Sequence, residues 1–118
     1  SYGGSGAPTD TGYTAICSTY GAFAAVKADG AVTAWGSSWG GGSGAPTDTG
    51  YTAIYSTQYA FAAVKADGAV TAWGHSSYGG SGAPTDTGYT AIYSAQFAFA
   101  AVKADGAVTA WGGNPSNG

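Results

Sequence analysis

The sequence predicts an all-β fold built from tandem repeats, and two observations carry this prediction. A unit of 38 residues occurs three times without insertion or deletion, at 1–38, 39–76 and 77–114, and a four-residue tail follows at 115–118. Each unit holds short apolar runs, rich in β-branched and aromatic residues, between turn residues, which is typical of antiparallel strands. A unit this short cannot bury its own apolar face, so we expect the units to stack on one another.

Each unit predicts three strands and one long connector, as the second unit illustrates. Residues 51–57 alternate, 60–65 form a second apolar run, and 69–73 form a third. Asp67-Gly68 between the last two runs predicts a type I′ hairpin turn, with positive φ at both residues. We expect the Gly/Ser-rich segment 36–50 to be a connector with room for one short helical turn or an edge strand.

The two-residue turn also predicts a strand register, which pairs Val64 with Thr71 and Ala62 with Trp73. Large residues then oppose small ones across the hairpin, and both faces of the sheet are apolar. One face is expected to carry Ala62, Val64, Thr71 and Trp73, and the other Phe61, Ala63, Val70 and Ala72. A sheet with two apolar faces is expected to be covered on both sides.

The composition excludes several classes of function. Three basic residues in a chain of net charge −3 cannot follow a phosphate backbone, so nucleic acid is not expected as a partner. No apolar run reaches membrane-spanning length, and no signal peptide is visible. The low charge and the Gly/Ser/Thr/Tyr richness favour an extracellular or secreted setting. The single cysteine, Cys17, is replaced by Tyr55 and Tyr93 in the later units, which favours a space-filling role over a reactive thiol.

The strand core of each unit resembles a known repeat. Residues 54–74 contain Asp67-Gly68 followed by Val70-x-x-Trp73-Gly74, and Tyr78-Gly79 comes next. This pattern is similar to the propeller repeat of the regulator-of-chromosome-condensation family, and in blade size it is closest to the seven-bladed secreted inhibitor of β-lactamases. Ala60-Phe61 and Gln58-Tyr59 depart from the family's usual His-Thr and Gly-Gly. The resemblance implies three-stranded propeller-type blades, but not a function, since such propellers serve as exchange factors, inhibitors and binding platforms.

Three units are too few to close a propeller, which has about four to eight blades. Three blades would leave two apolar faces exposed, so the expected partner is another copy of the chain. Two or three copies would complete a ring of six or nine blades, or the same contact would propagate as a filament. The alternative is a closed three-fold monomer of trefoil or prism type. Such near-identical units are expected of a designed sequence or of a recently amplified gene.

No catalytic residue, cofactor or metal site is predicted. His75 is the only histidine, and no second histidine or cysteine in its unit would help it bind zinc. Asp48, like Asp10 and Asp86, lies in a Pro-Thr-Asp-Thr-Gly segment without the acidic spacing of a calcium loop, so local capping is expected instead. Lysines 27, 65 and 103 precede the hairpin tips, where we expect them to pair with a neighbouring aspartate.

Candidate binding residues come from positions at which the three units differ, because these positions fall in turns. Aromatic and amide side chains there suit a carbohydrate or protein ligand. The alternative explanation, which we favour, is that exposed turns tolerate drift after duplication. The candidate binding residues are Tyr20, Trp39, Gln58, Tyr59, His75, Gln96 and Phe97. The residues expected to be structural are Asp29, Gly30, Trp35, Asp67, Gly68, Trp73, Asp105, Gly106 and Trp111.

The sequence thus predicts a non-enzymatic structural module that assembles with copies of itself. The alternative function is a carbohydrate- or protein-binding propeller that uses the aromatic turn residues.

Overall fold

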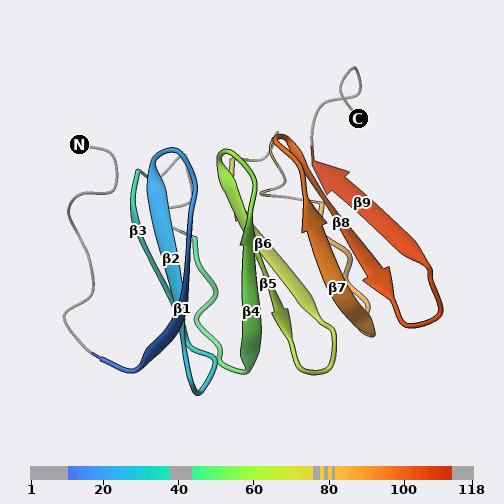
Figure 1. Cartoon of the computed structure of the whole chain (residues 1–118), viewed down its shortest axis with the longest axis horizontal. Helices are drawn as coiled ribbons and strands as arrows, with labels where there is room; N and C mark the ends of the chain where they lie inside the picture. Colours follow the sequence, from blue (N-terminus) through green and yellow to red (C-terminus); the bar gives the residue numbers. More distant parts are fainter. Residues whose placement is uncertain (1–10, 38–43, 76–77, 79, 81, 113–118) are drawn as a thin grey trace.

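The chain folds into three small antiparallel sheets of three strands each, in the order β1-β2-β3, β4-β5-β6 and β7-β8-β9 (Figure 1). This computed structural model describes residues 11–37, 44–75, 78, 80 and 82–112. The predicted all-β repeat fold is confirmed. The strands are β1 (Tyr13–Ser18), β2 (Ala22–Lys27), β3 (Val32–Gly36), β4 (Tyr51–Ser56), β5 (Ala60–Lys65), β6 (Val70–Gly74), β7 (Tyr89–Ser94), β8 (Ala98–Lys103) and β9 (Val108–Gly112).

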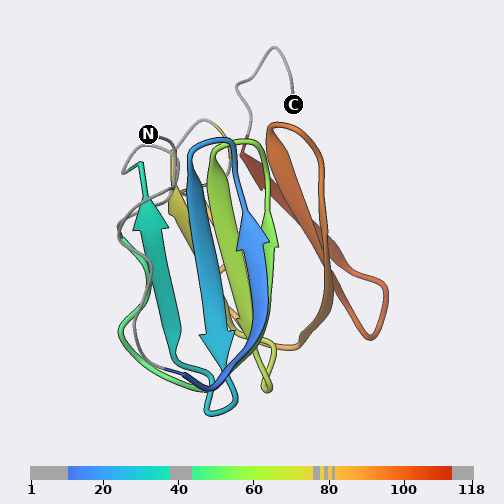
Figure 2. The same cartoon turned by 60° about the vertical axis from the view of Figure 1, so that its left-hand side comes forward.

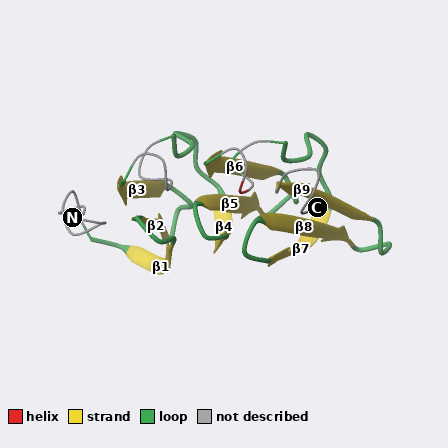
Figure 3. Ribbon diagram, turned by 90° about the horizontal axis from the view of Figure 1, so that it is seen from above, coloured by secondary structure: helices red, strands yellow, loops and turns green. Residues whose placement is uncertain are grey.

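The three sheets stand face to face in a row, so that the middle sheet is covered on both sides (Figures 1 and 3). One apolar core lies between the first two sheets, and a second lies between the last two. Among the described residues the first and third sheets share no core, and Figure 2 shows them on opposite sides of the middle sheet. The row is therefore open, and the closed three-fold monomer is not the arrangement that the chain adopts.

The predicted turn type is wrong, although the hairpins form where they were expected. Gly68 N–H donates to the Lys65 carbonyl at 2.9 Å, and Lys65 N–H donates to the Ala69 carbonyl at 2.9 Å. Within this turn Gly68 has a positive φ of 87°, whereas Asp67 does not, since no non-glycine residue of the described chain has a positive φ. The loop is thus a three-residue type I turn closed by a glycine bulge. Asp67 contributes instead through its side chain, whose Oδ1 accepts the Ala69 N–H at 3.0 Å.

The additional turn residue shifts the predicted register by one position and exchanges the residues between faces. Phe61 pairs with Trp73, and Val64 pairs with Val70, in place of the predicted Ala62–Trp73 and Val64–Thr71 pairs. Large residues therefore oppose large ones, because cross-strand partners share a face. Each sheet has one face with bulky side chains and one face with small side chains, rather than two mixed faces.

A bulge near the start of each first strand adds a tyrosine to the bulky face. The register shifts between Tyr51 and Ala53, which places Thr52 in the irregularity. The Thr52 hydroxyl donates to the Val64 carbonyl at 3.2 Å. Simple alternation would place Tyr51 with Tyr55, whereas the bulge brings it into the core that contains Phe61. The sequence pattern contains no signal for this bulge.

Near their Pro-Thr-Asp residues, the described connectors contain neither of the optional elements that the sequence allowed, and a short 3₁₀ turn lies instead at Tyr78, whose N–H donates to the His75 carbonyl at 3.0 Å. Segments 44–50 and 82–88, which include the Pro-Thr-Asp residues, have no helix or strand. Within the described part of the chain, no helix is long and apolar enough to cross a membrane.

Candidate functional site

The bulky face of each sheet is built around a stacked pair of aromatic rings. Phe61 and Trp73 stack with ring centroids 5.5 Å apart, and the equivalent pairs in the other sheets lie at 5.6 and 5.4 Å. The tyrosine of the bulge and one isoleucine complete the face. We define the bulky face as Tyr13, Ile16, Phe23 and Trp35 in the first sheet, Tyr51, Ile54, Phe61 and Trp73 in the second, and Tyr89, Ile92, Phe99 and Trp111 in the third.

The opposite face of each sheet consists of alanine and valine, with one further residue on the first strand that differs between the sheets. We define this alanine face by Ala22, Ala24, Val26, Val32 and Ala34 in the first sheet, Ala60, Ala62, Val64, Val70 and Ala72 in the second, and Ala98, Ala100, Val102, Val108 and Ala110 in the third. This first-strand residue is Cys17 in the first sheet, and the larger Tyr55 and Tyr93 take its place in the second and third sheets.

The bulky face of one sheet packs onto the alanine face of the sheet before it. Phe61 and Trp73 share a core with Ala22 and Ala24, and Phe99 and Trp111 share a core with Ala60 and Ala62. Both Phe61 and Phe99 are almost fully buried. Small residues leave room for the aromatic pair of the next sheet, so the two faces are complementary in shape.

The ends of the row present one face of each kind. Ile16 on the first bulky face is 63% exposed, whereas the equivalent Ile92 is 4% exposed. Val108 on the last alanine face is 63% exposed, whereas the equivalent Val70 is 9% exposed. The end faces thus expose side chains whose equivalents are buried in the two internal interfaces.

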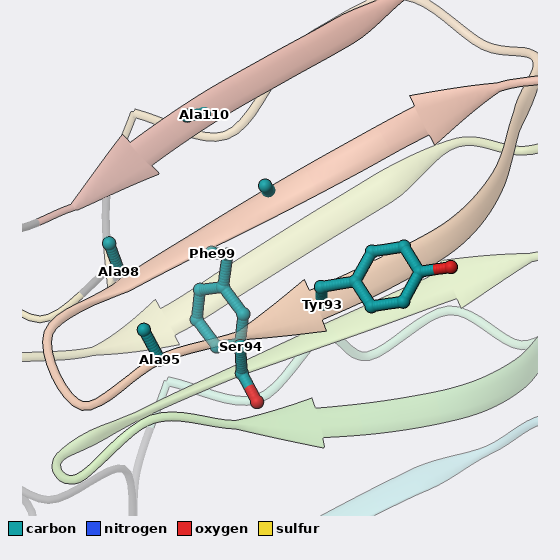
Figure 4. A pocket seen from close by; sticks show the side chains of 7 residues that line it. Tyr93, Ser94, Ala95, Ala98, Phe99 and Ala110 are labelled. Atoms are coloured by element: carbon teal, nitrogen blue, oxygen red, sulfur yellow. The ribbon is translucent and has the colours of Figure 1, made fainter. Parts of the chain in front are cut away.

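The last alanine face is hollowed where an aromatic pair would fit. A hollow of about 240 Å³ is lined by residues of the third sheet, with Tyr93 beside it (Figure 4). The side chains of Ala98, Ala100 and Ala110 lie at the positions that, in the middle sheet, receive Phe99 and Trp111.

The hairpin tips add backbone hydrogen bonds at the edge of each internal interface. Gly50 N–H donates to the Asp29 carbonyl at 3.2 Å, and Tyr51 N–H donates to the Gly30 carbonyl at 3.3 Å. The next interface repeats both bonds, from 88 to 67 at 3.0 Å and from 89 to 68 at 3.4 Å. The first two tips therefore each bind the backbone at the start of the following sheet.

A charged cluster beside these bonds holds the connector against the sheet. Lys65 pairs with Asp48, and its ammonium lies 5.1 Å from the Tyr51 ring centroid. The Tyr51 hydroxyl contacts the Asp48 carboxylate at 3.0 Å and the Thr71 hydroxyl at 2.7 Å. The hydrogen bond from Lys65 lowers the pKa of Asp48, and the same bond raises the pKa of Lys65. The third sheet repeats the cluster, with Lys103 and Asp86 at 2.7 Å.

This cluster confirms the predicted pairing of Lys65 and Lys103 with aspartates, and it gives Asp48 and Asp86 a structural role. Asp10 lies outside the described residues. Asp29, Asp67 and Asp105 each accept the backbone N–H two residues ahead, at 2.9 to 3.0 Å. In the part of the chain that the structure describes, no three His, Cys, Asp or Glu side chains gather as metal ligands.

The structure brings most of the candidate binding residues together along one rim of the row. Tyr20 contacts Tyr59 edge-on at 5.6 Å, Tyr59 contacts Tyr78 at 4.7 Å, and Tyr78 contacts Phe97 at 5.1 Å. His75 lies 4.9 Å from Tyr78. Trp39 lies outside the described residues. Tyr78 belongs to the same rim, although it was not among the predicted binding residues.

The same rim carries a line of backbone hydrogen bonds between the sheets. Tyr20 N–H donates to the Gln58 carbonyl at 2.9 Å, and Gln58 N–H donates to the Gln96 carbonyl at 3.1 Å. The Gln96 side-chain amide also donates to the Gln58 side chain at 2.9 Å. The rim residues thus connect adjacent sheets as well as forming a surface.

Cys17 is half-buried at the interface between the first and second sheets. Its thiol lies 3.6 Å from the Ile54 carbonyl and 3.8 Å from the Ser56 hydroxyl. These contacts agree with a small side chain that fills space where the later units have tyrosine.

Comparison of the sequence with the models of known protein families and with curated proteins finds no match.

Proposed function

We propose that this protein is a non-enzymatic structural module that assembles head to tail with copies of itself. One observation carries the proposal: the exposed bulky face of the first sheet and the exposed alanine face of the third are the two halves of the internal interface. Exposed apolar faces of this kind are costly in water and mark association surfaces. A second copy is the partner that already has the complementary face.

Two copies in a closed ring are the assembly that best fits the repeat number. The contact joins different faces, so it is heterologous and generates a ring or a filament. A ring built from whole chains contains a multiple of three blades, and propellers close with about four to eight. Six blades from two chains is the multiple within that range.

The arrangement of the sheets supports propeller-type blades, as the resemblance to the regulator-of-chromosome-condensation repeat implies. Each sheet is a meander of adjacent strands, and successive sheets pack face to face, as in a propeller. The three strands per sheet agree with the short blades of the β-lactamase inhibitory protein. The interface is apolar and contains small-to-large complementarity, as expected of an obligate contact.

Sedimentation velocity from low to high micromolar concentration tests the proposal. The expected result is a single species of twice the chain mass that replaces the monomer as the concentration rises. A mass that continues to grow would indicate a filament in place of the ring. A strict monomer at high micromolar concentration would overturn self-assembly.

We propose carbohydrate binding at the aromatic rim as the second candidate function, because the structure gathers Tyr20, Tyr59, Tyr78 and Phe97 into one row. Tyr20 is 69% exposed and offers a ring to a sugar. A glycan array read with wild type, Tyr20→Ala and the ring-preserving Tyr20→Phe tests this function. Binding lost only in Tyr20→Ala would support it, and a blank array would refute it.

A further inference from the structure

The third hairpin tip differs from the first two in its surroundings, although its sequence is the same. Gly30 and Gly68 are buried, and a Cβ on either would overlap the backbone of the following sheet. Gly106 is exposed, and a Cβ there meets no atom within 4 Å. The tip nevertheless has the same conformation, with φ of 89° compared with 87° at the other two.

We infer that the tip formed by Asp105 and Gly106 is a binding site for the backbone of residues 12 and 13 in a second copy of this chain. The Asp105 carbonyl accepts the Gly12 N–H of that copy, and the Gly106 carbonyl accepts its Tyr13 N–H. Both bonds extend the pattern that the chain makes at residues 29–30 and 67–68. The inference rests on the proposed self-assembly and adds the contact that fixes its register.

Glycine is required at the tip by the close approach of the second backbone. At both internal interfaces the entering backbone occupies the space that a Cβ would need. The residue that donates its N–H to the tip has no such requirement. Gly50, with φ of 96°, has open space around a Cβ although its N–H binds the tip of the neighbouring sheet. Gly12, the residue equivalent to Gly50, also has φ of 96° and open space.

This asymmetry supplies a matched pair of variants, Gly106→Asn and Gly50→Asn, because Gly50 has the same open space as Gly12 but lies at an internal interface. Both substitutions place a side chain at positive φ, which asparagine tolerates better than most residues. Only Gly106→Asn places an atom where the second backbone must lie. Circular dichroism at a concentration where the chain is monomeric shows whether each variant is folded.

The expected result is that Gly106→Asn weakens association by about 30-fold per junction, the effect of losing two backbone hydrogen bonds. Gly50→Asn, which lies outside the junction between copies, is expected to associate like wild type. Hydrogen exchange of the wild-type Gly12 amide is the second measurement, and it is expected to slow when the assembly forms.

The outcomes separate this inference from the proposed function. A wild-type chain that stays monomeric overturns both. A wild-type chain that assembles while the two variants associate equally, or while the Gly12 amide exchanges at its monomer rate, overturns the tip contact and leaves self-assembly standing. Selective loss in Gly106→Asn, together with slowed Gly12 exchange, supports the inference.

Discussion

Ile16→Ala and Ile92→Ala make the same chemical change at equivalent positions, but we expect them to affect different properties. Ile92→Ala should lower the stability of the monomer, and Ile16→Ala should weaken the association of chains. Ile92 is 4% exposed inside the chain, so its truncation should lower the free energy of unfolding of the monomer by about 2–5 kcal/mol. Ile16 is 63% exposed in the single chain. Its truncation should therefore change monomer stability by less than about 1 kcal/mol.

The effect of Ile16→Ala should appear in association. Burying Ile16 to the level of Ile92 covers about six-tenths of a side chain whose full burial contributes roughly 1.5–3 kcal/mol. Each junction then loses about 1–2 kcal/mol, a factor of about 5–30 in the association constant. A two-chain ring has two junctions, so its dimerisation constant should fall by roughly 30- to 800-fold.

Urea unfolding at dilute concentration measures the monomer stability of both variants, and sedimentation velocity measures association. The reasoning is refuted if Ile16→Ala destabilises the monomer as much as Ile92→Ala does. It is also refuted if Ile16→Ala forms the assembly with wild-type affinity, because the first bulky face would then lie outside the junction.

Three further predictions concern other contacts. The hydrogen bond from Lys65 lowers the pKa of Asp48, so this carboxylate stabilises the fold at pH values above its ordinary pKa of 3.8. The contribution is lost as the pH falls through the lowered pKa. In urea unfolding measured at acidic pH, Asp48→Asn should therefore reduce the decrease of the free energy of unfolding with falling pH. Thr57, which is 6% exposed, donates to the Tyr78 carbonyl at 2.6 Å, so Thr57→Val should cost about 1–2 kcal/mol in thermal or urea unfolding. Tyr93→Cys should keep association within about fivefold of wild type in sedimentation under reducing conditions, since Cys17 supports stacking at the same position.

The sequence was sufficient to predict the repeat, the nine strands and the positions of the hairpins, because alternation and turn residues are local signals. The register was not predictable by the same route. Asp67-Gly68 fits both a two-residue turn and a three-residue turn with a glycine bulge. The choice between them decides whether Phe61 opposes Trp73 or lies on the other face. The packing of the Phe61–Trp73 pair against the preceding sheet favours the three-residue turn.

The site was predictable only in part for a related reason. The differences between units pointed to Tyr20, Tyr59 and Phe97, and the structure does gather them on one rim. The end faces and the hairpin-tip bonds carry no such signal, since their residues are the same in all three units. Gly30 and Gly106 occupy the same position of the repeat and have nearly the same φ, 87° and 89°, and they differ only in the presence of a following sheet.

The position shared by Cys17, Tyr55 and Tyr93 indicates which internal interface a junction between chains would copy. The interface between the first two sheets contains Cys17, whereas that between the last two contains Tyr55. A junction formed by the third alanine face would contain Tyr93, and so would resemble the second interface. The first interface, with its smaller residue, therefore differs from the second internal interface and from the junction between chains. Cys17 separates the first interface from the other two, and the rim positions that differ between units add to this difference.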